Sequence, residues 1–323
     1  MTKVTINDVA KAAGVSRALV SIAYRGVPGV SEATAQHIFQ IGKKLGYVPN
    51  LNAARLASKK LNTIGVFLQD LHNEVFADVF DGIRSVIGQS DNQIVLAVGS
   101  AEAGHDAKAL ETLIASQVDV IIAAGLTMSD AQLLKFATRT KLVSVTRKVA
   151  KVSSVTSDDY MGAKLAVGHL ISRGHSKIAF LANPQTDGYT DRLRGYRDAV
   201  IEAGLSPLIQ ETTYSRVQAE LDAASLIAKK PTAIFAHNDM AALGVVDALV
   251  SEGLKPGVDV DVVGFDNTSL SQTPVLALTT VDPQSHTLGQ EAAKIALGIL
   301  KNGGKKLESV QLTPTLVIRS TAP

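Results

Sequence analysis

From residue 63 onward the chain alternates short apolar runs with longer segments in which apolar residues recur at helical spacing. The apolar runs occupy 63–68, 93–98, 118–122 and 141–145, and then 177–181, 232–235 and 260–263. Short strands separated by helices predict parallel sheets that are covered on both faces. Because the series runs twice, we expect an α/β body with two doubly wound lobes at 62–323. The first lobe would span about 62–160 and 289–317, and the second about 161–288 and 318–323.

The first 49 residues show a different pattern, in which three short amphipathic segments follow one another. Thr5 begins one segment with a capping-box-like sequence, and Ser16 and Ser31 can cap a second and a third helix. The first two helices would be joined at Gly14 by a short turn, which is the spacing of a helix-turn-helix. We therefore expect a separate helical domain at 1–49.

Charge also separates these two parts of the chain. The whole sequence carries a formal net charge of +2, but residues 1–60 contain nine Lys and Arg against two acidic residues, a net +7. The remaining residues, with 23 bases and 28 acids, carry −5. A basic terminal domain on a larger acidic body favours contact between the small domain and a polyanion such as nucleic acid. A basic face that is merely solvated is the alternative.

The composition excludes several classes of protein. The 323 residues include no Cys, which excludes a disulfide framework, a thiolate metal site and a cysteine nucleophile, and a reducing compartment is expected. The first residues lack the apolar segment of a secretory signal, and no apolar run approaches the roughly 20 residues that a membrane span needs. We expect a cytoplasmic protein with no metal ion, no cofactor and no membrane contact.

Several segments of the chain match one family at the correct spacing. The stretch 4–17, followed by 30–34 and 45–50, resembles the DNA-binding headpiece of the lactose-repressor family of bacterial transcription regulators. The similarity continues through 53–58 into 63–66. The resemblance implies a ligand-responsive, sequence-specific DNA-binding protein, most often a repressor. It also implies a hinge helix at 50–61 between the headpiece and the body.

In that family the second helix lies in the major groove, and the positions here that match its base-reading residues are Arg17, Ala18 and Ile22. Arg17 can bond the O6 and N7 atoms of a guanine, a contact that discriminates by about 1–3 kcal/mol. Ala18 and Ile22 offer apolar contact, for example to thymine methyl groups. Most relatives carry Arg where Ile22 stands and Asn where Arg25 stands, which implies a different operator. Internal packing of Ile22 is the alternative.

The remaining DNA contacts that the resemblance implies lie on the headpiece and in the hinge. Phosphate contacts, which position the domain without reading sequence, are expected at Thr5, Ser16, Ser21 and Arg25. In relatives the hinge folds when two copies pair on DNA, and the leucine that matches Leu56 enters the minor groove and bends the duplex. Asn50 belongs to the same group of contacts. Alternatively, Leu56 covers the surface of the body.

In doubly wound sheets, ligands bind in the crevice beyond the carboxyl ends of the strands. The polar residues just past the predicted strands, together with one glycine, are Asp70, Asn73, Ser100, Gly125, Arg147, Asn183, Asn238, Asp239, Asp266, Asn267, Asp282 and Gln284. Carboxylates, amides and arginines that converge from two lobes suit a neutral polyhydroxyl ligand. For any single residue, the alternative is a helix N-cap that follows its strand.

The body also resembles the sugar-binding proteins related to the regulatory core of the family. Carried over residue by residue, the resemblance implies ligand contacts at Asn73, Phe76, Arg147, Arg192, Asn238, Asp266 and Gln284. Phe76 would stack on an apolar sugar face, and the two arginines would donate to hydroxyls. Val75 replaces an aromatic residue and Thr146 a carboxylate, which disfavours a pentose bound as in ribose-binding relatives. A cyclic polyol, another sugar and a nucleoside remain open.

We therefore predict a homodimeric repressor that binds near-palindromic operator DNA and a small-molecule effector. Inducer and corepressor action are both open. The chain ends at Pro323 without a leucine-heptad tail, which favours a dimer over a tetramer. One alternative is a sugar-binding protein of a transport system. An enzyme on the same fold is disfavoured, because no glycine-rich phosphate loop and no nucleophile elbow occurs.

Overall fold

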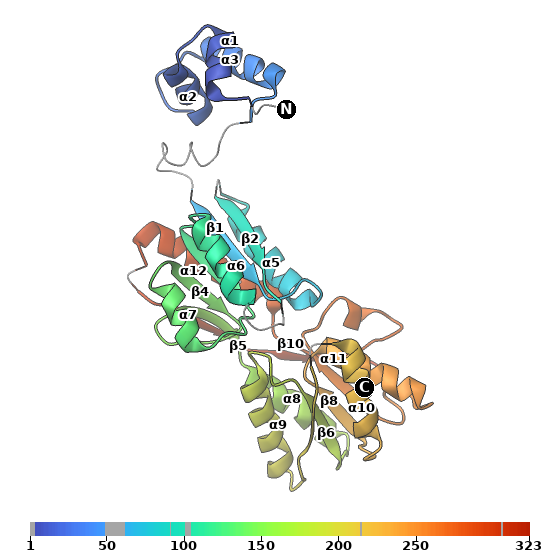
Figure 1. The fold of residues 1–323 in the computed structure, drawn as a ribbon. Coiled ribbons are helices and arrows are strands. Elements are labelled where there is room, and N and C mark those ends of the chain that lie inside the picture. The colour runs from blue at the N-terminus through green and yellow to red at the C-terminus, as the bar shows by residue number, and fades with distance from the viewer. Residues whose placement is uncertain (1–3, 49–61, 91, 101–104, 214, 305) are drawn as a thin grey trace. The chain divides into compact units, whose positions relative to one another are not determined.

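The computed structural model describes residues 4–48, 62–90, 92–100, 105–213, 215–304 and 306–323. The chain forms two compact units that divide between residues 61 and 62, and each is considered separately (Figure 1). The predicted hinge at 50–61, with Asn50 and Leu56, lies outside the described residues. No helix within the described ranges is both long enough and apolar enough to cross a membrane.

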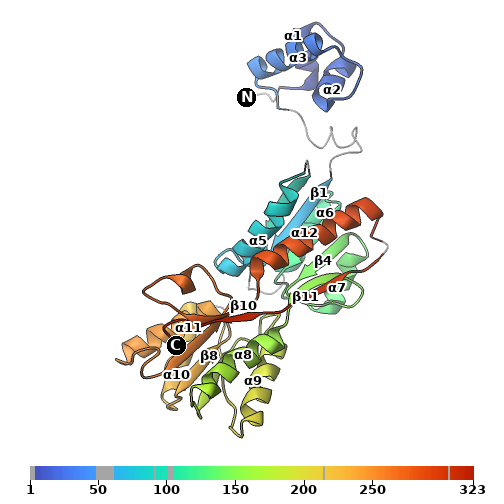
Figure 2. The same ribbon diagram turned by 180° about the vertical axis from the view of Figure 1, so that it is seen from behind.

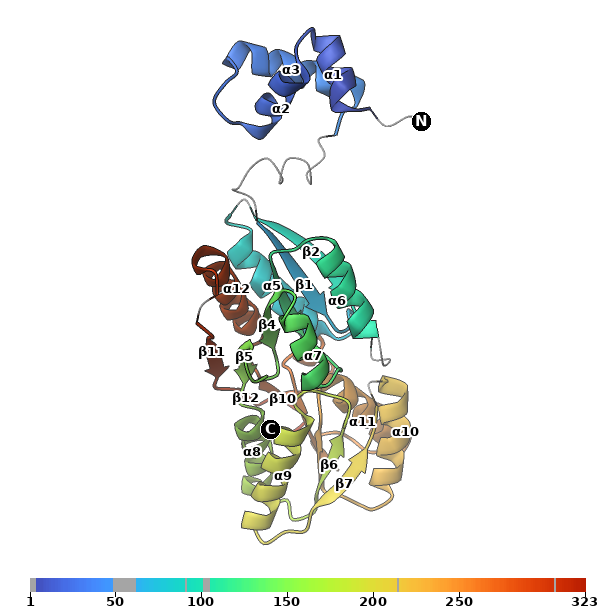
Figure 3. The ribbon, with the colours of Figure 1, turned by 60° about the vertical axis from the view of Figure 1, so that its left-hand side comes forward.

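Within residues 4–48 the first unit forms three helices, α1 (Ile6–Ala13), α2 (Arg17–Arg25) and α3 (Glu32–Leu45), which Figure 3 shows together. Thr5 and Asp8 form the expected capping box, and the hydroxyls of Ser16 and Ser31 cap α2 and α3. Val9, Val20 and Ile38 are fully buried and form a small core that one helix alone could not make. The predicted helix-turn-helix pattern is confirmed.

The first lobe of the second unit is built on a six-stranded parallel sheet in the order β11-β5-β4-β3-β1-β2. Its strands are β1 (Thr63–Leu68), β2 (Gln93–Val98), β3 (Val120–Ala124), β4 (Lys141–Val145), β5 (Ser153–Ser157) and β11 (Ser309–Leu312). Its helices are α5 (Glu74–Ile87), α6 (His105–Ala115), α7 (Asp130–Ala137) and α12 (Ser285–Asn302). β1 and β3 are buried along their whole length, as expected for inner parallel strands.

The second lobe repeats this design with a sheet in the order β12-β10-β9-β8-β6-β7, in which only β12 is antiparallel among the described strands. Its strands are β6 (Ile178–Ala182), β7 (Leu208–Glu211), β8 (Ala233–Ala236), β9 (Asp261–Phe265), β10 (Thr279–Asp282) and β12 (Thr315–Val317). Its helices are α8 (Asp159–Ser172), α9 (Tyr189–Glu202), α10 (Arg216–Ile227), α11 (Asp239–Ser251) and the short η1 (Leu270–Gln272).

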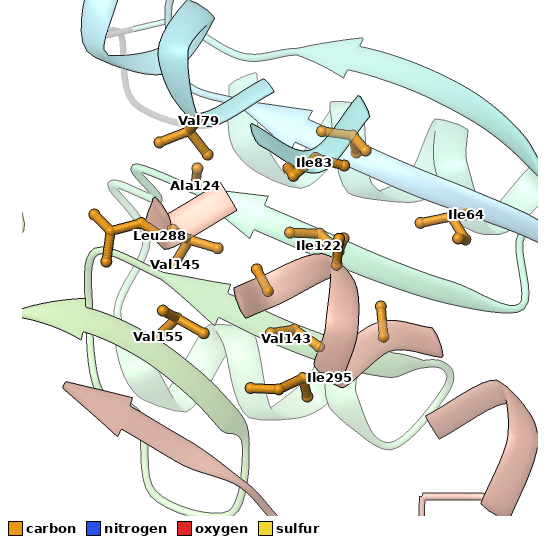
Figure 4. Close-up of a cluster of buried hydrophobic side chains, with 14 of the residues drawn as sticks. Ile64, Val79, Ile83, Ile122, Ala124, Val143, Val145, Val155, Leu288 and Ile295 are labelled. Carbon is orange, nitrogen blue, oxygen red and sulfur yellow. The ribbon is translucent and has the colours of Figure 1, made fainter. Parts of the chain in front are cut away.

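Helices cover both faces of each sheet, which confirms the predicted α/β class. In the first lobe, α5 and α12 pack on one face and α6 and α7 on the other. In the second lobe, α8 and α9 lie opposite α10 and α11. Figure 4 shows the apolar layer under α5 and α12, where Ile83 and Ile295 meet Ile122 and Val143 from the strands.

The chain passes between the lobes three times, after β5, after β10 and after β11 (Figure 2). The predicted lobe boundaries were a few residues off at these passages. Residues 315–317 were assigned to the first lobe, but Val317 pairs with Thr280 in the sheet of the second lobe. α12, a helix of the first lobe, begins at Ser285, whereas that lobe was expected to resume at about 289. α8, a helix of the second lobe, begins at Asp159, whereas that lobe was expected to begin at about 161. A short apolar run does not by itself indicate which of two sheets it will join.

The contact between α5 and α12 depends on small residues. A Cβ atom at Gly82 would collide with the carbonyl oxygen of His286, and one at Gly289 would collide with that of Val79. The two helices therefore approach closely, backbone against backbone. This contact fixes the start of α12, which follows the second passage between the lobes.

Candidate functional site

The recognition surface expected on α2 is exposed at its N-terminal end. Arg17 and Ala18 are exposed, whereas Ile22 is half-buried and packs beside Gly29. Arg17 and Ala18 are therefore accessible from outside the headpiece, and their contact with bases stays a prediction. The two interpretations of Ile22 are compatible, because a half-buried side chain can pack against its own domain and still present an apolar edge.

The predicted phosphate-contact residues are all polar groups near helix ends or on α2. Thr5 and Ser16 are exposed, and their hydroxyls belong to the caps of α1 and α2. Ser21 and Arg25 are half-buried, and the Nε atom of Arg25 donates to the Ser21 carbonyl oxygen over 3.0 Å. Helix N-termini attract phosphate oxygens, because their backbone N–H groups point outward.

Aromatic packing holds α2 against α3. The ring of Tyr24 lies 5.0 Å from that of Phe39 and 5.3 Å from that of Tyr47, both edge to face. A Cβ atom at Gly42 would collide with the Tyr24 hydroxyl, so glycine leaves room for this ring on α3. The orientation of α2 within its unit is thus set by side-chain packing.

In the second unit, a cavity lies between the lobes, at the carboxyl ends of the strands. From the first lobe and the passages it is lined by Gln69, Asn73, Val75, Phe76, Gly125, Thr146, Ser157, Pro283 and Leu288. From the second lobe it is lined by Asp159, Thr186, Asp187, Gly188, Arg192, His237, Asn238 and Asp266.

Most of the predicted ligand contacts meet at this cavity. Five of them line it: Asn73, Phe76, Arg192, Asn238 and Asp266. Asn73 and Asn238 also cap α5 and α11 by accepting from the backbone N–H groups of Val75 and Ala241 over 3.2 and 2.9 Å. Asn73 and Asn238 therefore both cap a helix and line the cavity, so the two interpretations do not exclude each other.

Two predicted ligand contacts, Arg147 and Gln284, are not among the residues that line the cavity. The Nη2 atom of Arg147 donates to the Met128 carbonyl oxygen over 2.9 Å, and its Nη1 lies 3.4 Å from a carboxylate oxygen of Asp187. The Nε2 atom of Gln284 donates to the Thr313 carbonyl oxygen over 2.7 Å. Protein partners thus hold both side chains, and the prediction that they bind ligand directly is not supported.

Asp187 places a carboxylate beside Thr146, the position at which this sequence lacks the carboxylate of the sugar-binding relatives. Thr146 stands where the sugar-binding relatives carry a carboxylate, and its Oγ1 donates to Asp187 Oδ2 over 2.8 Å across the two lobes. Burial raises the pKa of Asp187 to about 6, and the charge of Arg147 and the bond from Thr146 oppose this shift. A carboxylate from the second lobe therefore stands beside the position that lacks one in the first.

Arg192 is held in place by three contacts. Its Nε donates to Asp159 Oδ1 over 2.7 Å, and its Nη1 donates to the His237 carbonyl oxygen over 2.6 Å. Its guanidinium carbon lies 3.5 Å from the centre of the Phe265 ring, a cation–π contact. Burial raises the pKa of Asp159, while the charge of Arg192 opposes that rise.

Asp266 and Asp239 are neighbouring buried carboxylates with different surroundings. Asp239 Oδ2 accepts from the backbone N–H and the hydroxyl of Thr268 over 2.8 and 2.9 Å, and its Oδ1 accepts from the Thr280 hydroxyl. Asp266 is 6% exposed, and within the described part of the chain its carboxylate has no hydrogen-bond donor. Burial raises its pKa well above the ordinary value. Asp239 is thus a structural residue, and Asp266 is available to a ligand.

His237 is a buried residue on the same wall. The Thr186 hydroxyl lies within hydrogen-bond distance of both the Asn183 carbonyl oxygen, at 2.9 Å, and His237 Nε2, at 2.6 Å. The Nδ1 atom of His237 is buried with no partner among the described residues. Burial lowers the pKa of His237 well below its ordinary value.

Sequence reasoning missed three titratable residues of the wall, Asp159, Asp187 and His237. Asp159 follows β5, a strand of mostly Ser and Thr that the apolar pattern did not predict. His237 directly follows β8 and could have been found by the strand-end rule. No group of three or more His, Asp or Glu side chains in the described ranges is arranged to hold a metal ion.

A helix-turn-helix unit joined in one chain to a two-lobed body with an interlobe cavity defines a DNA-binding regulator controlled by a small molecule. Residues 5–50 match the bacterial regulatory proteins of the lacI family, and residues 167–322 match the periplasmic binding protein-like domain. Similarity to known proteins extends over nearly the whole chain.

The transcriptional regulator DegA of Bacillus subtilis is 31% identical, with 99% of each chain covered, and catabolite control protein A of Priestia megaterium is 30% identical, with 98% and 99% covered. A crystal structure of the lac repressor dimer bound to operator and the anti-inducer ONPF aligns with a TM-score of 0.85 at 27% identity, covering 99% of each chain. The chain therefore belongs to the lacI family of bacterial regulatory proteins, and it is a transcription regulator rather than an enzyme or a transport protein.

Proposed function

We propose that this regulator is a repressor that binds a near-palindromic operator as a homodimer, under the control of a sugar, cyclic polyol or nucleoside bound between its lobes. The main support is that one chain joins an exposed recognition helix to a cavity whose wall includes Asp266, a carboxylate to which no described residue donates a hydrogen bond. Because its target is bacterial chromosomal DNA, the compartment we propose is the cytoplasm.

On DNA, Arg17 reads a guanine, and Ala18 and Ile22 contact thymine methyl groups. Thr5, Ser16, Ser21 and Arg25 bind phosphates and set the position of α2 in the groove. Two headpieces read half-sites about one helical turn apart. The exposure of Arg17 and Ala18 at the N-terminal end of α2 supports this assignment.

The hinge contacts, Asn50 and the minor-groove residue Leu56, remain part of the proposal on the ground of family resemblance. They fall outside the described residues. A hinge that folds only on operator would link the headpiece to the body, because its folding depends on how two bodies are placed.

In the body, Phe76 supplies an apolar face, and Asn73, Arg192, Asn238 and Asp266 supply polar groups. Arg147 and Gln284 take supporting roles instead of direct ones. Arg147 holds Asp187 on the cavity wall, and Gln284 holds the passage at Thr313. Effector binding that changes the placement of the first lobes would change operator affinity, typically by about 1–3 kcal/mol.

Selection of binding sites from random duplexes tests the DNA-binding part of the proposal. The full-length protein should enrich a near-palindrome whose half-sites contain a guanine at one fixed position and thymines beside it. Equal retention of all duplexes would contradict sequence-specific binding. Enrichment of a single half-site by a monomer would contradict the homodimer.

A further inference from the structure

The cavity wall has more carboxylates than cationic side chains that pair with them. Three carboxylates line the cavity, those of Asp159, Asp187 and Asp266, but Arg192 is the only Lys or Arg side chain among the described lining residues. Arg192 forms an ion pair of 2.7 Å with Asp159. Arg147, from outside the lining, lies 3.4 Å from Asp187. Two carboxylates therefore have cationic partners, and the third does not.

Asp266 is the carboxylate that has no cationic partner. This residue is only 6% exposed, and no hydrogen-bond donor within the described ranges reaches its carboxylate. Arg192 is the cation that influences it, but this guanidinium is already bound to Asp159 and to the His237 carbonyl oxygen. Burial without a paired cation raises the pKa of Asp266 well above its ordinary value, and a ligand that brings a positive charge would stabilise the ionised form of this carboxylate.

The donors and acceptors of a ligand decide what it can offer to Asp266. An ammonium group has three donors and no acceptor, so it suits a carboxylate that no described residue hydrogen-bonds, whereas a phosphate or carboxylate has only acceptors at neutral pH.

We propose that the effector of this regulator carries one positive charge, as a protonated amino group on a sugar or cyclic polyol ring, and that Asp266 pairs with this group. The proposal rests on the proposed function, in which this cavity is the effector site. It adds that amines are preferred over their hydroxyl parents and that sugar phosphates and sugar acids are excluded.

Matched pairs of compounds test the preference by isothermal titration of the full-length protein at pH 7.5. The pairs are glucosamine and glucose, galactosamine and galactose, and scyllo-inosamine and scyllo-inositol, with glucose 6-phosphate and galacturonate as anions. At least one amine should bind about tenfold more tightly than its parent, since charge-assisted hydrogen bonds are about twice as strong as neutral ones. Neither anion should bind.

Two cavity variants locate the origin of the preference. Asp266→Asn should bring an amine and its parent within about twofold of each other, because the amide carries no charge. Asp159→Asn should reduce the preference as well, because it releases Arg192 toward Asp266. Asp81→Asn, the same change on the exposed face of α5, should leave the preference intact.

Equal or tighter binding of a hydroxyl parent, binding of either anion, or silence of all three amines would overturn the proposal. A preference that survives in both Asp266→Asn and Asp159→Asn would overturn it too. The proposed function fails by a different result. An amine that binds with the expected preference but leaves operator affinity unchanged would contradict effector control and would leave the charge assignment standing.

Discussion

Single residues divide the work of this regulator between base reading and positioning. Arg17 is exposed at the start of α2, whereas the hydroxyl of Ser16 is used to cap the same helix. An arginine that bonds the O6 and N7 atoms of a guanine carries sequence information, and a phosphate contact does not. The two kinds of residue should therefore respond differently to substitution.

Arg17→Ala should weaken binding to the selected operator by about 1–3 kcal/mol and should relax base preference at one position in each half-site. Fluorescence anisotropy with a set of single-base operator variants measures both effects. Arg84→Ala removes the same charge from the exposed face of α5 and should change neither. An Arg17→Ala protein that keeps the full base preference would show that this residue contacts only the backbone.

Asp187 should make the stability of the second unit depend on pH. Its pKa is raised from 3.8 to about 6 on folding, mainly by burial, so the folded state holds the proton more tightly than the unfolded state. The stabilisation from this group is therefore complete below about pH 3.8 and is lost as the pH rises through about 6.

Between pH 4.5 and 7, the free energy of unfolding should fall by about 2 kcal/mol less in Asp187→Asn than in the unsubstituted protein. Each pKa unit corresponds to about 1.36 kcal/mol. Urea denaturation at the two pH values gives this difference. Asp81→Asn is the matched control on an exposed helix face. Parallel pH profiles for the Asp187→Asn and unsubstituted proteins would contradict the raised pKa.

The candidate site was only partly predictable from single residues. Residues that follow strongly apolar strands, such as Asn238 after β8 and Asp266 after β9, were found because the strand pattern locates them. Asp187 was missed because it lies within a loop before α9, away from a strand end. The contacts of Arg147 with Asp187 and Met128 join segments that are distant in sequence, so no local pattern could indicate them.

Elements were predictable where they are long or apolar. The ranges of β1, β2 and β4 agree with the apolar runs, because such runs have few other places in a folded chain. β5 and β12 were missed. β5 is rich in Ser and Thr, β12 is only three residues long, and pairing with a neighbouring strand stabilises both. The passages between the lobes are made of such segments, so their boundaries were the least certain part of the fold.

The close contact of α5 with α12 gives a test at the level of helices. Gly82→Ala should destabilise the protein by about 1–3 kcal/mol, because the added Cβ collides with the His286 carbonyl oxygen. Gly168→Ala is the matched control in α8, where the Cβ meets open space and should stabilise by up to about 1 kcal/mol. Urea denaturation distinguishes the two, and equal effects would contradict the proposed helix spacing.

The whole molecule joins two sites that belong to separate units of one chain. Effector control requires that the cavity and the recognition helix influence each other through the segment between them and through the pairing of two copies. Thermodynamic linkage makes this influence mutual, so an effector that changes operator affinity must itself bind with a changed affinity when operator is present.

The most direct test of the account measures effector affinity with and without saturating operator. An isothermal titration with the tightest-binding compound should give dissociation constants that differ by about 5- to 150-fold between free and operator-bound protein. Operator affinity measured with and without that compound should change by the same factor. Equal effector affinity in the two states would contradict the claim that the cavity controls DNA binding.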